Sequence, residues 1–508
     1  MIRKTYHFLI VSFRVILETA FEKINTEHTD GYCMHILKKY IGDRAFYKML
    51  FSLVIPLVIQ QGVTNFVSLV DNLMVGSLGT GEMSSVAIVN QLVFVFNLAV
   101  FGGISGASIF GAQFAGVGDD TGLRQTFRFK WIFGIVITGL AIVAFYMFGD
   151  RLVLLFLENE SNAEADIETL LGYAHSYLWI ILFGLVPFMI VQVYSSTLRE
   201  MGDTVVPMAA SVVAILVNIV FNYLLIFGKF GFPRWGVAGA AAATVLSRYV
   251  ELAVVMLHTH RHAEKFRFIR GAYRSLYIPA SLIKKIALTG TPLMLNEVLW
   301  SLAMTFINRA YSTHGLEAVA AVNITTTAWN LFCVIMFAMG TAVSILVGRE
   351  LGRGDKARAV DLNRKILAFT LSIHIVIGVL VMLVARLIPE LYNTEPEVKA
   401  LAARLLVIAG ASLPMHSLVH CIYFTIRSGG KTLITFLFDS VYTWAIPAVL
   451  AYCLCTYTQL PLYLIYLIVQ FSDAVKMVIG LIMLRSGFWA NTVIREERYE
   501  SIQSNCEL

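Results

Sequence analysis

The chain has few charged residues and few cysteines for its length. Asp, Glu, Lys and Arg make up 14% of its 508 residues and hydrophobic residues 58%, whereas soluble domains are about 25% charged and about 45–50% apolar. This shortage of charge excludes an ordinary soluble protein and indicates a membrane protein. None of the six cysteines forms a CxxC pair, so we expect small buried side chains rather than a disulfide framework or a cysteine metal site.

Motifs that carry enzyme chemistry are also missing. The sequence has no Walker A motif and no HExxH metal motif, and the histidine-rich stretch at 258–262 reads as a solvated basic loop. An intramembrane transferase would need a clustered acid, His or Arg motif at a membrane edge, and none is found. No basic patch is interleaved with aromatic residues, which argues against nucleic acid as a partner. We therefore expect neither an enzyme nor a metal cofactor.

Long apolar stretches fill the sequence instead. A helix crosses the membrane with about 20 apolar residues. Stretches of this kind are centred near residues 62, 98, 140, 184, 217, 247, 296, 333, 376, 412, 443 and 472. They leave no room for a soluble domain of ordinary size. The sequence therefore predicts an all-α integral membrane protein with about twelve transmembrane helices.

One part of the sequence occurs twice. Residues 56–119 align without a gap on residues 292–355, at an offset of 236 positions. The paired positions include residues that apolarity alone does not explain: Pro56 with Pro292, Gly79 with Gly315, Gly116 with Gly352, and Asp119 with Asp355. Both copies run in the same direction, so we predict two pseudo-symmetric six-helix bundles, related by a twofold axis along the membrane normal.

A shorter repeat supports the same conclusion. Arg199 and Arg427 each lie in a hydrophobic-Arg-x-x-Gly-x-Thr pattern, where a helix is expected to leave the membrane. We expect both arginines to anchor these helix ends on phosphates or carbonyl groups, which is a structural role.

The loops alternate in charge along the chain. Connections that follow even-numbered helices are rich in Lys and Arg, whereas the loops at 158–168 and 392–400 are acidic. Excess Lys and Arg marks cytoplasmic loops, so we expect a multi-pass protein of the inner (plasma) membrane with both termini in the cytoplasm. The predicted parts are a bundle at 46–258, a connector at 259–283 that suits two moving bundles, a bundle at 284–486, and a cytoplasmic tail at 487–508.

Residues 1–45 form a separate segment with two open interpretations. The segment starts basic, but Arg14 interrupts its apolar run and no small-residue cleavage site follows, which argues against a signal peptide. It is either an amphipathic interfacial helix or an over-extended start, with Met34 as the true initiator.

Several motifs together resemble the multidrug and toxic compound extrusion (MATE) transporters. They are VDNLMVGSLG at 70–79, AIVNQ at 87–91, GAQFAGVGD at 111–119, TLREMGDT at 197–204, GVAGAAAATVLSRYVE at 236–251, GLEAVAAVNI at 315–324 and FTIRSGGKT at 424–432. The resemblance implies two lobes around a V-shaped cavity in a monomer surrounded by lipid, which exports amphipathic, often cationic small molecules in exchange for H⁺ or Na⁺. The alternative is a lipid-linked oligosaccharide flippase, which would be expected to have a strongly basic cavity.

Asp71 is the first candidate for ion coupling. An acid inside a spanning helix is costly and is therefore a functional candidate, although a helix-end acid near the outer interface is the simpler interpretation. The resemblance implies three partners for it: Asn218, Asn222 and Thr244. The two asparagines are four residues apart and so share one helix face. Relatives often have Asp where this chain has Asn222, and the loss of that acid favours H⁺ over Na⁺.

Glu297 is the second candidate, in the other half of the repeat. The resemblance implies an acidic partner on the tenth helix, where this chain has His416, with His420 one turn further. A histidine titrates near neutral pH and repels Na⁺ when protonated, which again favours H⁺. No cofactor other than this coupling ion is expected.

Further polar residues lie on helices expected to line the cavity, where they either contact substrate or bond between helices. They are Gln60, Gln61, Asn90, Gln91, Asn97, Asn296, Asn323 and Asn330. Two pairs of charges lie three residues apart, Arg248 with Glu251 and Asp473 with Lys476, and we expect each pair to neutralise itself. The pattern offers no role for Asp439.

Overall fold

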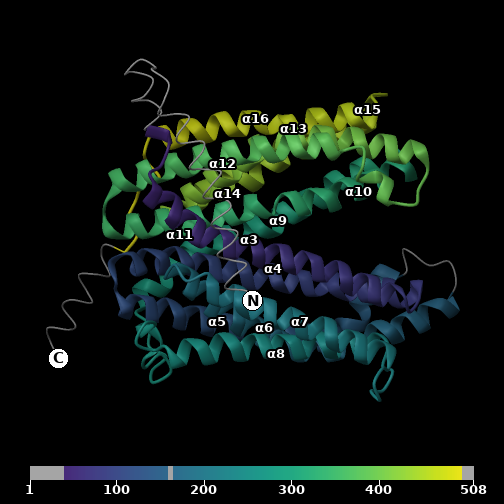
Figure 1. The fold of residues 1–508 in the computed structure, drawn as a ribbon, viewed down its shortest axis with the longest axis horizontal. Coiled ribbons are helices and arrows are strands. Elements are labelled where there is room, and N and C mark those ends of the chain that lie inside the picture. The colour runs from purple at the N-terminus through teal and green to yellow at the C-terminus, as the bar shows by residue number, and fades with distance from the viewer. Residues whose placement is uncertain (1–38, 158–163, 495–508) are drawn as a thin grey trace.

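A computed structural model describes residues 39–157 and 164–494. Within these residues the regular structure is entirely helical. The first bundle consists of α3 (Arg44–Gly76), α4 (Thr80–Val117), α5 (Asp120–Leu157), α6 (Glu164–Glu200), α7 (Val205–Phe227) and α8 (Val237–Arg261). Figure 1 shows α4 to α8 in the lower half of the molecule, with α3 entering from the upper half. The interpretations of residues 1–38 fall outside the described residues.

The second bundle lies above the first in Figure 1. It consists of α9 (Ala280–Ser312), α10 (Leu316–Phe332), α11 (Val334–Arg353), α12 (Lys356–Val384), α13 (Pro396–Ser428), α14 (Thr432–Phe436), the π-helical turns η3 (Leu437–Val441) and η4 (Trp444–Ala448), α15 (Val449–Tyr457) and α16 (Leu462–Arg485). Short 3-10 turns, η1 (Arg267–Ile269) and η2 (Pro389–Leu391), lie in connections. In the described part of the chain, 11 helices are long and apolar enough to cross a membrane. The prediction of a multi-pass membrane protein is confirmed.

The helix ends follow the sequence repeat. At the offset of 236 residues, the ends of α3 coincide with those of α9, and each helix contains the repeated proline. The ends of α4 likewise coincide with Leu316 and Arg353, although Cys333 separates α10 from α11 there. Gly118 and Gly354 end these helices with φ of 73° and 82°, a left-handed cap that glycine adopts at little cost. The predicted pair of pseudo-symmetric bundles is confirmed.

The two bundles are joined by helices that cross between them. Phe46, Leu50 and Leu53 of α3 are buried in the core of the second bundle, whereas Leu282 and Ile286 of α9 are buried in the core of the first. Figure 1 shows both helices at the boundary between the bundles. Each bundle therefore holds one half of the other's first helix.

The central contact between the bundles lies where α4 meets α11. A Cβ atom on Gly116 would lie 2.1 Å from the carbonyl oxygen of Arg349, and one on Gly352 would lie 2.1 Å from that of Gln113. These two contacts are equivalent under the repeat, since each pair is offset by 236 residues. The glycines let the backbones approach to a distance that a side chain would prevent. This end of the molecule is closed.

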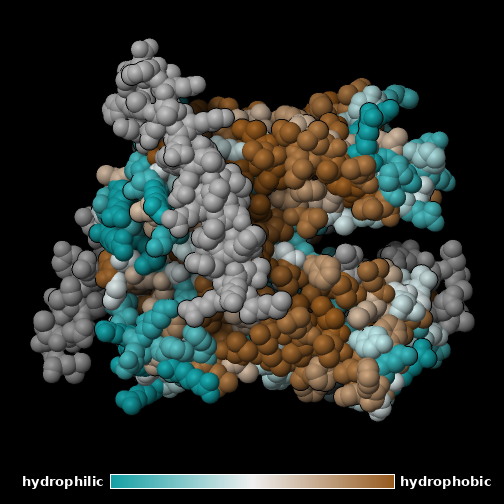
Figure 2. Space-filling model, viewed as in Figure 1, coloured by the Kyte–Doolittle hydropathy of each residue, from teal (hydrophilic) through white to brown (hydrophobic). Residues whose placement is uncertain are grey.

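The opposite end is open. Figure 2 shows a hollow between the two bundles at the right-hand end, and apolar surface over the middle of both. Large apolar side chains such as Leu140, Phe183, Val376 and Leu383 are exposed on the outer helices, as expected for contact with lipid. The molecule is a V whose arms are the two bundles and whose vertex is the α4–α11 contact.

The predicted connector at 259–283 is packed against the first bundle at the closed end. Phe266 and Phe268 of the connector are buried in the core of the first bundle, and Arg128 donates to the carbonyl oxygens of Gly271, Ala272 and Tyr277. These described residues of the connector are thus fixed to the first bundle rather than slack. The apolar side chains that hold the connector in place lie among basic residues. The prediction of an exposed connector was based on those basic residues.

The segment after α16 crosses from one bundle to the other. Trp489 is buried in the core of the second bundle and Ile494 in the core of the first. Between them, the backbone N–H of Val493 donates to Gln113 Oε1 at 2.8 Å. The described part of the predicted tail is therefore a strap across the closed end.

Candidate ion and substrate site

Asp71 lies in a polar cluster near the open end of α3. It is half-buried, and its Oδ1 accepts a hydrogen bond of 2.6 Å from Asn222 Nδ2. Asn222 Nδ2 also lies 3.2 Å from Asn218 Oδ1, and Asn218 Nδ2 donates to Thr244 Oγ1 at 3.4 Å. The structure thus brings together the four residues predicted from the sequence, in one chain of side-chain contacts across α3, α7 and α8.

Asn222 contributes a buried acceptor to the cluster. Asn218 and Asn222 are 4% and 1% exposed, and Asn222 Oδ1 has no hydrogen-bond partner among the described residues. A buried polar atom without a partner is costly and suggests that something binds there. A carboxylate, an amide oxygen and a threonine hydroxyl are suitable ligands for a proton or a small hard cation.

Arg248 places a positive charge near this cluster and already has a partner. Its Nη1 donates to Glu251 Oε2 at 3.0 Å, and its guanidinium lies 5.2 Å from the centre of the Phe188 ring. The expected pairing of Arg248 with Glu251 is therefore confirmed. Asp71 feels the positive charge of Arg248 without bonding to it, so it stays available to a ligand.

Arg199 and Gln60 belong to a second network, deeper in the same bundle. Gln60 donates to Ser211 Oγ at 2.7 Å, Ser211 donates to Glu251 Oε1 at 2.7 Å, and Arg199 Nη2 donates to Gln60 Oε1 at 3.0 Å. Of the two anchors expected for Arg199, phosphates or carbonyl groups, the structure shows the second, because Oε1 is the amide carbonyl oxygen of Gln60. Gln60 is likewise held by protein groups and is not a free substrate ligand.

In the second bundle, Glu297 and His416 do not meet. His416 Nε2 lies 3.5 Å from Asp473 Oδ2, and Glu297 has no hydrogen-bond or ion-pair partner among the described residues. The charges that act on Glu297 are those of Arg427 and Asp439. Arg427 is 4% exposed and its guanidinium lies 5.1 Å from the centre of the Phe424 ring, so it is enclosed by protein groups rather than by the phosphates that were one of its two expected anchors.

The expected Asp473–Lys476 pair is also replaced. Lys476 Nζ lies 2.7 Å from Asp439 Oδ1, and Asn296 Nδ2 donates to Asp439 Oδ2 at 2.9 Å. Asp439 lies in the π-helical turn η3, and such turns are common at functional sites. Sequence reasoning missed this ion pair, and its only signal was an aspartate inside a spanning helix.

The remaining predicted cavity residues lie mostly at accessible positions. Gln61 donates to Asn65, and Asn65 Nδ2 donates across the cleft to the carbonyl oxygen of Asn330 at 3.4 Å. Asn90 accepts from the Tyr177 hydroxyl at 3.3 Å. Gln91 and Asn323 are exposed and Asn97 is half-exposed.

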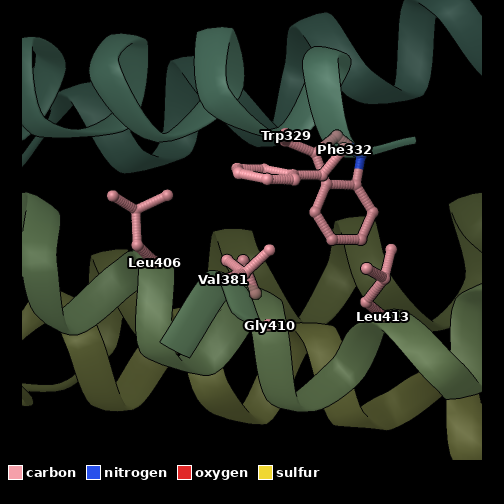
Figure 3. A pocket seen from close by; sticks show the side chains of 7 residues that line it. Trp329, Phe332, Val381, Leu406, Gly410 and Leu413 are labelled. Atoms are coloured by element: carbon pink, nitrogen blue, oxygen red, sulfur yellow. The ribbon is translucent and has the colours of Figure 1, made fainter. Parts of the chain in front are cut away.

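An apolar pocket lies apart from these polar groups, within the second bundle. Figure 3 shows Trp329 and Phe332 of α10 facing Val381 of α12 and Leu406, Gly410 and Leu413 of α13. Its lining contains no acid or base. It can take part in apolar contact but not in ion binding.

Two six-helix bundles around a cleft that opens at one end, with a partly buried acid on its wall, define a polytopic membrane transporter. The comparisons give the family. The MatE family profile matches residues 56–224 and 292–453, which covers more than half of the chain, so the protein belongs to the MATE family of multidrug efflux transporters.

Relatives match along most of the chain. The "Probable multidrug resistance protein NorM" of Thermotoga maritima is 26% identical over 456 residues, which are 90% of this chain and 96% of that protein. The "Probable multidrug resistance protein YoeA" of Bacillus subtilis is 27% identical over 412 residues, 80% of this chain and 86% of that protein. Neither match favours the flippase alternative.

A solved structure supports the fold. A multidrug resistance MATE family transporter of the MOP superfamily in its outward-facing conformation superposes with a TM-score of 0.78 at 20% identity, over 91% of this chain and 99% of that chain.

Proposed function

We propose that the protein is a secondary active exporter of amphipathic, cationic small molecules, driven by exchange with H⁺ at Asp71. The observation that carries the proposal is the bond from Asn222 to Asp71 beside a buried amide oxygen without a partner. A carboxylate that interacts with a cationic substrate only while it is ionised can couple substrate release to ion binding.

The charge of Asp71 controls the proposed exchange. When Asp71 is ionised, it accepts the Asn222 hydrogen bond and attracts a cationic substrate into the cleft. When it takes up a proton from the open end, its charge is lost, so the attraction for the substrate is lost with it. The closed end then opens for the next cycle, and the acid releases its proton on that side.

The choice of H⁺ over Na⁺ rests on the ligands. Asp71 is the one carboxylate in the cluster of Asp71, Asn218, Asn222 and Thr244, and Arg248 adds a positive charge nearby. A Na⁺ ion would need several oxygen ligands and gains from a second acid, whereas a proton needs only one carboxyl group. The site is therefore better suited to a proton.

The closed end is proposed to face the cytoplasm of a cell whose plasma membrane holds the protein. Basic residues gather there: Lys265 pairs with Asp203, and Arg353 donates to the carbonyl oxygen of Gly116. Excess positive charge is retained on the cytoplasmic side. The cleft of this structure then opens to the outside, where a proton enters and a substrate leaves. The protein is proposed to work as a monomer.

Asp71→Asn tests the proposal in cells. The amide keeps the size of the side chain but can no longer take up and release a proton, so ethidium efflux should fall to the level of cells without the protein. Asp150→Asn is the matched control, because Asp150 is an exposed acid of the same bundle that pairs with His175. Normal efflux by Asp71→Asn at normal membrane abundance would refute the role of Asp71.

A further inference from the structure

Both bundles carry a buried polar network at equivalent positions. Three pairs of residues define the equivalence. Gln60 and Asn296 are 236 residues apart, the offset of the sequence repeat. Ser211 lies 12 residues after Arg199, as Asp439 does after Arg427, and Glu251 is residue 15 of α8, as Lys476 is of α16. In each bundle the contacts run in the same order, from the first helix to the fifth and on to the sixth. The two networks are copies of one arrangement.

The charges in the two copies are opposite. In the first bundle the sixth helix supplies the anion Glu251, which accepts a hydrogen bond from Ser211. In the second bundle the same helix position is the cation Lys476, which donates to Asp439 at 2.7 Å. The neighbouring positions are inverted too, since Asp473 is residue 12 of α16 and Arg248 is residue 12 of α8.

The Lys476 ammonium is enclosed like a bound cation. Its side chain is 5% exposed and that of Asp439 is 18% exposed. Besides the carboxylate, Nζ lies 5.4 Å and 5.6 Å from the ring centres of Phe438 and Tyr442, where ring faces attract positive charge. Asp439 is thus neutralised by a group of the same chain.

The second oxygen of Asp439 is held as well. Asn296 Nδ2 donates to Oδ2 at 2.9 Å and lies 3.3 Å from the Tyr423 hydroxyl, while Ser440 Oγ donates to Asn296 Oδ1 at 2.8 Å. Asn296 therefore fixes one oxygen of the carboxylate and leaves the other, Oδ1, facing the ammonium, and carboxylate oxygens are ligands of hard cations. Lys476 stands where such a cation would bind.

We infer that Lys476 is a tethered cation that permanently fills the cation site at Asp439 and so prevents the second bundle from binding a free cation such as Na⁺ there. The inference deepens the proposed function. It rests on that proposal in one respect, the assignment of ion exchange to the first bundle. It predicts that removing the ammonium, while keeping the carboxylate, creates a Na⁺ site that the native protein does not have.

The experiment measures Na⁺ binding without transport. Lys476→Met is made in an Asp71→Asn background, so that any ion bound at Asp71 does not contribute, and the thermal melting of the purified protein is followed as choline chloride is replaced by NaCl. The melting temperature should rise with Na⁺ and saturate, because a ligand that binds only the folded state stabilises it. Lys476→Arg, which keeps the positive charge, should show no rise.

A second variant separates charge from packing. Lys476→Met/Asp439→Asn in the same background has neither charge, so it should fold in either salt and should not respond to Na⁺. The inference is overturned if Lys476→Met shows no saturable Na⁺ response, or if Lys476→Arg or the double variant shows the same one. It is overturned as well if Lys476→Met fails to fold in both salts, because Na⁺ then does not replace the ammonium. Failure of the proposed function would appear only in transport and leaves these outcomes unchanged.

Discussion

Asn222 sets the number of negative charges around Asp71. Its Nδ2 donates to Asp71 at 2.6 Å while its Oδ1 has no partner among the described residues, so an acid at this position would place two carboxylates in contact. Two acids this close favour a bound cation between them. The residue therefore bears directly on the choice of coupling ion.

Asn222→Asp should make efflux responsive to Na⁺. With a second carboxylate beside Asp71, vesicles should export substrate on a sodium gradient at constant pH, which the native protein should not do. Asn323→Asp is the control, because it adds an acid at an exposed position of α10 in the other bundle. An Asn222→Asp variant as insensitive to Na⁺ as this control would contradict the assignment.

A buried ion pair supports the first bundle near its closed end. Lys130 is fully buried, and its Nζ lies 2.5 Å from Glu200 Oε1 and donates to Ser196 and Thr197. Removing one partner leaves an unpaired charge inside the bundle. Glu200→Gln should therefore lower the stability by about 3–5 kcal/mol.

The double variant Glu200→Gln/Lys130→Met tests the cause of that loss. It removes both charges, so its melting temperature in detergent should recover most of the drop seen in Glu200→Gln. If both variants melt equally low, the loss comes from packing rather than from the unpaired charge.

At the residue scale, spacing within a helix predicted which side chains share a face but not which partner each of them bonds to. Asn218 and Asn222 share a face, as their spacing of four residues required, and both reach the cluster of Asp71. Asp473 and Lys476 have a comparable spacing, yet Lys476 bonds to Asp439 on another helix. A partner 37 residues away in sequence leaves no local signal.

At the scale of elements, the fifth helices of the two bundles differ. In the first bundle α7 is a regular α-helix, whereas the matching stretch 432–457 contains the π turns η3 and η4. The length of the apolar stretches predicted a spanning helix in both places, and apolar length does not distinguish π turns from α turns.

The α4–α11 contact makes its own prediction. Gly116→Ala would place a methyl group 2.1 Å from the position of the Arg349 carbonyl oxygen, so the two backbones must separate and the closed end should open. Electron–electron distances between spin labels at Asp119→Cys and Asp355→Cys should become longer and broader.

Gly139→Ala is the matched control, because a Cβ atom there meets nothing within 4 Å. Its distance distribution should equal that of the native helix. An unchanged distribution in Gly116→Ala would show that the glycine contact does not hold the closed end together.

At the scale of the whole molecule, the two bundles share one fold but differ in their polar and charged residues. The repeat predicted both bundles and their register. In the second bundle, however, Ile307 stands at the position equivalent to Asp71 and Val469 at that of Thr244, and Ile307 and Val469 are buried in an apolar core. The second bundle thus has no copy of the Asp71 cluster. The packing of the connector and the strap depends on buried side chains far apart in sequence, which no local pattern reveals.

The most direct test of proton exchange at Asp71 is substrate efflux from vesicles that carry either a pH gradient alone or a sodium gradient alone. The account predicts full efflux on the pH gradient, none on the sodium gradient, and loss of activity in Asp71→Asn. Full efflux on sodium alone, lost in Glu297→Gln and kept in Asp71→Asn, would contradict both the ion and the bundle to which coupling is assigned.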